Sequence, residues 1–164
     1  MIGPPEGLAQ AVQGWAHLFS KTKAVSMGVT YVHFAGLLLG GGVAVAADRE
    51  TLRAAKEAEP FRADHLAFLG TVHSIAIAGL AMLFASGIGL FLADIETFWA
   101  SRVFWMKMSL VMLLLLNGLL MKRAERLAAT SPEAAWKNLK TTSVASLVLW
   151  FTIVLASTIL AASA

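Results

Sequence analysis

The sequence predicts an all-α integral membrane protein, a four-transmembrane-helix bundle preceded by a short N-terminal interfacial helix. Of its 164 residues, 58 % are apolar and only 14 % are charged, and the mean hydropathy is +0.72. Soluble domains usually carry about 25 % charged residues. Four stretches reach the ~20 mainly apolar residues that a helix needs to cross the hydrocarbon. They leave little sequence for a soluble part, so we expect a single integral membrane domain over residues 1–164.

The four expected spans cover about residues 24–47, 66–93, 103–121 and 141–163. The connections between them also have helical patterns. Residues 48–58 are expected to extend the first span as a helix, with Arg53 and Glu57 at the i, i+4 spacing of an ion pair, and we expect this helix to end at Pro60. The capping-box spacing of Thr130 and Glu133 predicts the start of a short helix that continues into the fourth span.

Residues 6–20 precede the first span and carry one apolar stripe. Leu8, Val12, Trp15 and Phe19 follow each other at intervals of three or four residues, which is the spacing of one helix face. An amphipathic helix of this kind typically lies in the membrane interface. We therefore expect a short helix on the membrane surface before the first span.

The distribution of cations predicts the orientation. Nine of the thirteen Lys and Arg residues fall in the connections 48–65 and 122–140: Arg49, Arg53, Lys56, Arg62, Lys122, Arg123, Arg126, Lys137 and Lys140. Because cytoplasmic loops are enriched in Lys and Arg, both termini are expected outside and both long connections in the cytoplasm, in a multi-pass protein of the plasma (inner) membrane.

Composition also excludes several kinds of chemistry. The chain has no cysteine, which excludes disulfides, iron–sulfur clusters, cysteine zinc sites and covalently attached c-type haem. A pI near 9.5 would indicate nucleic acid in a soluble protein. In a membrane protein, cations that face anionic lipid explain it, so we expect the lipid bilayer and no nucleic acid as a partner.

The first expected span contains His33. Because polar side chains are energetically costly in lipid, its position there requires an explanation. Gly36 and Gly40 follow it by three and seven residues and share its face. A strip without side chains next to an imidazole leaves room for a flat porphyrin. The alternative is that the glycines allow another helix to approach closely.

His73 has similar surroundings in the second span. Gly70 and Ala76 flank it at three residues on either side. It is either a ligand or a neutral histidine that is hydrogen-bonded across the bundle. Asn117, in the third span, is expected at a similar depth. It either orients the second ring nitrogen of His73 or joins two helices by a hydrogen bond.

The remaining polar residues are expected at the membrane boundaries. Lys107 lies five residues from Arg102, and we expect its ammonium group to extend to the interface. His17 and His65 are expected to be solvated. Met108 and Met112 share a helix face, and thioethers combined with an imidazole suit Cu(I), although methionine is also common core filler.

Two stretches resemble a known family. They are Val32-His33-Phe34-Ala35-Gly36 with Gly40 and Gly41, and the run RVFWMKMSLVMLLLLNGLLMKR that ends at Arg123. Both are similar to four-helix membrane modules of the CopD-like kind, which in turn resemble membrane b-type cytochromes. The resemblance implies a metal or haem site that uses His33 and His73.

The function expected from the sequence is that of a small membrane b-type cytochrome. Non-covalent haem b would be held by His33 and His73, with a quinol or a protein as redox partner. The alternatives are a copper-handling CopD-like protein, and a non-catalytic subunit or assembly factor in a homo-oligomer or larger membrane complex. An ion or proton channel is not favoured, because no chain of carboxylates crosses the bilayer.

The depth of the two histidines bears on this hypothesis. At ~1.5 Å per residue, His33 falls about 4 Å outside the midplane and His73 about 9 Å inside it. One iron requires both ligands at nearly the same depth. Because the ends of the spans are uncertain by several residues, we still expect one shared iron rather than two sites.

Overall fold

The computed structural model describes residues 3–57, 61–128 and 132–163, and every element in them is a helix. Four helical stretches are long and apolar enough to cross a membrane: Lys23–Ala54, Asp64–Ala93, Arg102–Ala128 and Ala135–Ala162. The expected all-α bundle of four spans is therefore confirmed. Pro60 and the start of the expected capping box at Thr130 lie outside the described residues.

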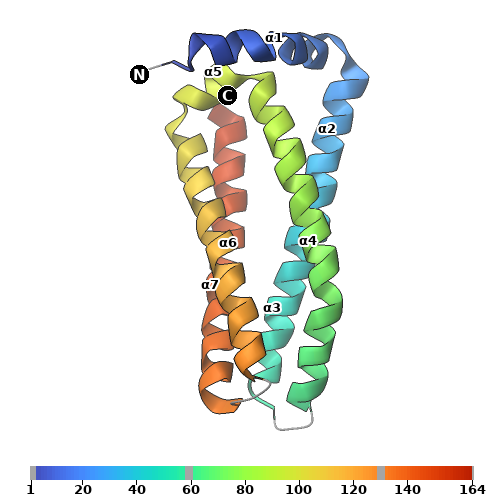
Figure 1. Cartoon of the computed structure of the whole chain (residues 1–164), viewed down its shortest axis with the longest axis vertical. Coiled ribbons are helices and arrows are strands. Elements are labelled where there is room, and N and C mark those ends of the chain that lie inside the picture. Colours follow the sequence, from blue (N-terminus) through green and yellow to red (C-terminus); the bar gives the residue numbers. More distant parts are fainter. Residues whose placement is uncertain (1–2, 58–60, 129–131, 164) are drawn as a thin grey trace.

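The elements follow the chain as a simple up-and-down bundle (Figure 1). Helix α1 (Glu6–Lys21) is followed by the first span, which consists of α2 (Lys23–Gly36), the π-helical turn η1 (Leu37–Gly42) and α3 (Val43–Ala54). The second span is α4 (Phe61–Ala93), the short α5 (Ile95–Ala100) follows, and α6 (Arg102–Ala128) and α7 (Pro132–Ser163) complete the bundle.

The two ends of the bundle differ. The N- and C-termini, α1 and α5 lie at one end, which we call the termini end (Figure 1). The end of α3, the start of α4, the end of α6 and the start of α7 lie at the other, which we call the junction end. Helix α1 lies across the termini end and is fixed to α4 by Trp15, whose Nε1 donates to the carbonyl of Gly89 at 2.8 Å.

Several helices extend further than hydropathy alone indicates. The first span continues as a helix into the expected extension over residues 48–58 but ends at Ala54, and the third continues to Ala128, beyond its expected end at residue 121. The polar residues past the apolar part of the first span do not end its helix, because neighbouring helices cover them. Asp48, Thr51 and Ala54 are all buried. A polar side chain that is packed inside a bundle is compatible with a continuing helix.

The first span and α4 cross at a glycine contact. A Cβ atom at Gly36 would lie 2.8 Å from the backbone nitrogen of Leu83, and one at Gly40 would lie 3.0 Å from that of Leu80. On the other side of the contact, a Cβ atom at Gly79 would overlap the backbone of Gly40. The face of His33 that was expected to leave room for a porphyrin is therefore filled by the backbone of α4, and helix packing explains these glycines.

Two helix pairs form the bundle. The first span packs against α4, α6 packs along α7, and α3 joins the pairs by packing against α7. At the junction end, the buried core consists of Ala54, Ala124, Ala128, Ala135, Trp136 and Leu139. Leu114, Trp150 and Ile153 form a second core nearer the middle. Small residues dominate the first cluster, so the helices come close enough there to bring polar groups of different spans together.

Candidate functional site: a buried polar cluster near the junction end

His33 lies on α2 and faces α4. Its Nδ1 atom is 3.0 Å from the hydroxyl oxygen of Ser86. A Cβ atom at Gly87 would lie 3.6 Å from the ring, so the imidazole rests directly against α4. Lys107 of α6 is half-buried and lies within electrostatic range of His33. The half-buried side chain is compatible with a lysine whose ammonium group extends toward the interface, and that expectation stays a prediction.

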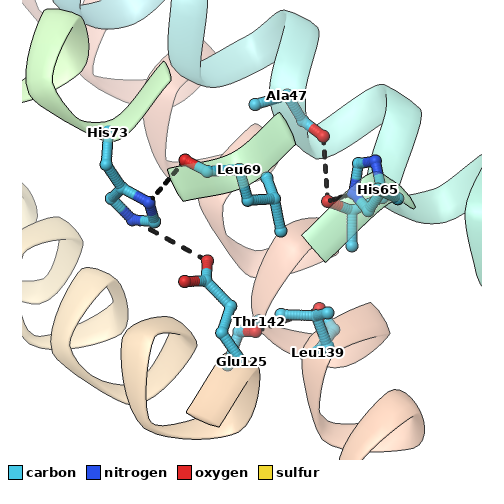
Figure 2. Close-up of polar contacts among 8 residues, drawn as sticks. Ala47, His65, Leu69, His73, Glu125, Leu139 and Thr142 are labelled. Atoms are coloured by element: carbon cyan, nitrogen blue, oxygen red, sulfur yellow. Dashed lines mark hydrogen bonds and ion pairs between the residues drawn. The ribbon is translucent and has the colours of Figure 1, made fainter. Parts of the chain in front are cut away.

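His73 lies on the side of α4 that faces α6 (Figure 2). Its Nδ1–H donates to the carbonyl of Leu69 at 2.9 Å, and its Nε2 lies 3.7 Å from Oε1 of Glu125. The space beside Gly70 is open, since a Cβ atom there would have no other atom within 4 Å. The Leu69 contact fixes one ring nitrogen and directs the other toward the carboxyl group of Glu125.

The structure does not bring His33 and His73 together. His33 contacts α4 at Ser86, thirteen residues after His73 in the same unbroken helix. At 1.5 Å per residue, this separation is about 20 Å. Two imidazoles that share one metal ion each lie about 2 Å from it. The single iron bound by both histidines, which the sequence led us to expect, does not fit this structure, because the axial offset of α2 against α4 places the histidines at different levels.

Asn117 takes the second of its two expected roles. Its side-chain amide donates to the carbonyl of Thr142 at 2.9 Å, so it joins α6 to α7 by a hydrogen bond rather than orienting His73. Among residues 3–57, 61–128 and 132–163, no group of three or more His, Cys, Asp or Glu side chains is arranged to hold a metal ion. The residues proposed from sequence thus do not form one site.

Asp48 is a buried carboxyl group that the sequence analysis assigned to the end of a span. Only 3 % of the residue is exposed, on α3, and it faces α7. The hydroxyl groups of Ser143 and Ser146 lie beside it. Within the described part of the chain, Oδ2 of Asp48 and Oγ of Ser143 are both buried without a hydrogen-bond partner. Such atoms are uncommon in native structures, so this position needs an explanation.

Glu125 brings a second carboxyl group into the same region. Its side chain, on α6, is only 15 % exposed. It lies within electrostatic range of Asp48 and of His73. Its Oε1 atom is buried, makes no hydrogen bond to any described residue, and lies 3.7 Å from Nε2 of His73. Asp48, His73 and Glu125, with Ser143 and Ser146, form what we call the carboxylate cluster, built from four different helices.

His65 is buried next to this cluster, contrary to the expectation that it is solvated. Only 7 % of the residue is exposed. The hydroxyl group of Thr51 donates to the carbonyl of Ala47 at 2.9 Å and therefore accepts from Nε2–H of His65, also at 2.9 Å (Figure 2). The ring of Trp136 covers it at 6.4 Å between centroids. His17, by contrast, is exposed on α1.

One signal in the sequence points to this region. Gly41, Ala44, Asp48 and Thr51 continue a stripe of small and polar residues at intervals of three or four, past the place where hydropathy ends the first span. A continued stripe indicates that the same helix face stays packed. Which residues of the other spans meet that face depends on the packing of the helices and has no local signal.

Comparisons of the chain with protein-family models, with curated proteins and with solved structures gave no match. The fold and the site define the class: a multi-pass membrane protein with four apolar helices and a cluster of titratable side chains buried between them.

Proposed function

We propose that this protein binds and releases protons at the carboxylate cluster and couples this exchange to a process in the membrane. The observation that carries the proposal is a pair of carboxyl groups, Asp48 and Glu125, that lie inside the bundle on different spans. Each has one buried oxygen atom, Oδ2 of Asp48 and Oε1 of Glu125, without a hydrogen-bond partner among the described residues. Ionisable residues inside transmembrane bundles mark proton relays and ion pathways more often than they serve stability.

Charge supports this assignment. Within the described residues, neither carboxyl group forms an ion pair with Lys or Arg, although Lys122 on the same helix lies within electrostatic range of Glu125. Two negative charges that are close together and poorly solvated repel each other, and removing a carboxylate from water is costly. A proton bound by one of the two groups removes this repulsion, and it also supplies a donor for an oxygen atom or a hydroxyl group nearby.

The exposure of the side chains indicates where protons enter the carboxylate cluster. The side chain of His73 is 29 % exposed and that of Glu125 is 15 % exposed, whereas Asp48 is enclosed. Protons therefore enter through His73 and Glu125 and end at Asp48. The sequence has no Asp or Glu in the spans between Asp48 and the termini end. We therefore assign a binding site that is reached from near the junction end, rather than a channel across the bilayer.

The test is the pH-induced infrared difference spectrum of the protein in lipid nanodiscs. We expect a carbonyl stretching band of a protonated carboxyl group that is lost in Asp48→Asn and shifted in Glu125→Gln. Glu50→Gln is the matched control, since Glu50 lies on the same helix as Asp48 and pairs with Arg53 at the surface. A spectrum in Asp48→Asn identical to that of the wild type would overturn the proposal.

A second candidate function is the binding of haem b for electron transfer. Of the two histidines expected to bind haem, only His73 would be a ligand. The donation from Nδ1–H to Leu69 leaves the lone pair on Nε2, which is the tautomer that a metal ligand requires. The open space beside Gly70 lies one turn away. Bound haem would supply one-electron chemistry, and a quinol or protein would be its redox partner.

An absorption spectrum of the purified protein tests this candidate. Haem binding predicts a Soret band that His73→Ala removes and His33→Ala retains, because His33 is bonded to Ser86. Colourless protein with stoichiometric copper would support the copper-handling alternative. Colourless, metal-free protein from haem-supplied cells would reject both and leave the proton-binding proposal or a non-catalytic subunit.

A further inference from the structure

A basic cavity of about 290 Å³ lies at the junction end, outside the carboxylate cluster. It is lined by Ala55, Arg62, Trp136, Lys137 and Lys140, which come from the end of α3, the start of α4 and the first turns of α7. Three of these five residues are cationic, and none of the described residues that line the cavity is acidic. Its lining therefore suits an anion.

Arg62 is held in place for this role. One of its N–H groups donates to the carbonyl of Ala55 at 3.1 Å, and its guanidinium carbon lies 5.1 Å from the ring centre of Trp136. Its Nε atom has no hydrogen-bond partner among the described residues. An arginine has five N–H donors, and among the described residues the bond to Ala55 uses one of them. Because the side chain is already fixed, little conformational entropy is lost when an anion binds.

The face of α7 that carries the two lysines continues as an apolar stripe. Lys137 and Lys140 are exposed and one turn apart. Val144, Val148, Phe151 and Leu155 follow at intervals of three or four residues, and all four are exposed large hydrophobic residues. In a helix this spacing places them on one face. A ligand with an anionic head and long apolar chains matches the cavity and the stripe together.

We propose that this cavity binds the phosphate group of an anionic phospholipid, whose acyl chains lie along the exposed stripe of α7. Arginine and lysine form strong charge-assisted hydrogen bonds to phosphate oxygens. Basic pockets between transmembrane helices are a known mode of anionic headgroup recognition. The contiguous stripe favours a lipid over free phosphate, because a free ion would use only the cavity.

The experiment measures which lipids remain bound. Protein purified from mixed phosphatidylglycerol and phosphatidylcholine vesicles is analysed by native mass spectrometry during stepwise delipidation. We expect the wild type to retain phosphatidylglycerol preferentially. The double variant Lys137→Gln/Lys140→Gln loses this preference by on the order of tenfold in affinity. The control variant Lys21→Gln/Lys23→Gln loses the same amount of charge at the termini end and is expected to keep the preference for phosphatidylglycerol.

Two further arms separate the possible results. Circular dichroism must show that the double variant keeps its helix content, and Phe151→Ser tests the stripe in a chain with an intact cavity, where weaker retention is expected. Equal retention of phosphatidylglycerol by the wild type and the double lysine variant would overturn the proposal. Displacement of the retained lipid by millimolar inorganic phosphate would also overturn it and would assign the cavity to free phosphate.

Discussion

Substitution of Gly79 by alanine tests the glycine contact between the first span and α4. The added Cβ atom would lie 2.6 Å from Cα of Gly40 and 2.7 Å from the carbonyl carbon of Leu39, and it would overlap the nitrogen of Gly40. All three are backbone atoms, so no change of rotamer relieves the overlap. The helices must move apart and lose contacts along the whole crossing. We expect the free energy of unfolding to fall by roughly 3 kcal/mol, at the upper end of overpacking costs.

The matched control is Gly70→Ala on the same helix, where the new Cβ atom would have no neighbour within 4 Å. Alanine is the better helix former by about 0.8–1.0 kcal/mol, so this variant is expected to be neutral or more stable. Unfolding is followed by circular dichroism in mixed micelles at increasing SDS. If Gly79→Ala unfolds at the same SDS fraction as the wild type, the helices are not packed at these glycines, and a space beside His33 has to be reconsidered.

Three other predictions address the polar residues and the orientation. At alkaline pH, where the buried carboxyl group of the wild type has lost its proton, Asp48→Asn is expected to keep the fold and to raise the stability in SDS by about 1 kcal/mol, since it removes a buried charge with no ion-pair partner among the described residues; a lower SDS midpoint under these conditions would mean that the carboxylate is paired. Asn117→Ala removes the hydrogen bond to Thr142 and is expected to destabilise the bundle by about 1–2 kcal/mol without altering any haem spectrum, whereas a shifted redox potential would restore its expected role beside His73. A reporter fused after Ala164 is expected to be active outside the cell and one inserted near Ala128 to be active in the cytoplasm, as the positive-inside rule predicts, and the opposite result would reverse the orientation.

The sequence by itself determined the class of the fold. Hydropathy and helical spacing are local properties, so the four spans and the amphipathic helix that the structure gives as Glu6–Lys21 were predicted without knowledge of their neighbours. The ends of the spans were less well predicted. Hydropathy counts each polar residue as exposed, and it therefore placed the end of the first apolar stretch before the buried Asp48. It placed the end of the third before Lys122, which is exposed, although α6 continues to Ala128.

Only the tertiary structure decided which residues meet. The sequence pointed to His33 and His73 as one site, but the offset of α2 along α4 separates them by about 20 Å. The sequence left open whether Gly36 and Gly40 face a cofactor or a helix. In the structure they pack against α4 around Gly79. Asp48 and Glu125, 77 residues apart in sequence, come together because α3, α6 and α7 converge on small residues at the junction end. Each helix can rotate and slide without any change in its own hydropathy, so the partners of a buried side chain are fixed by the packing of all four spans.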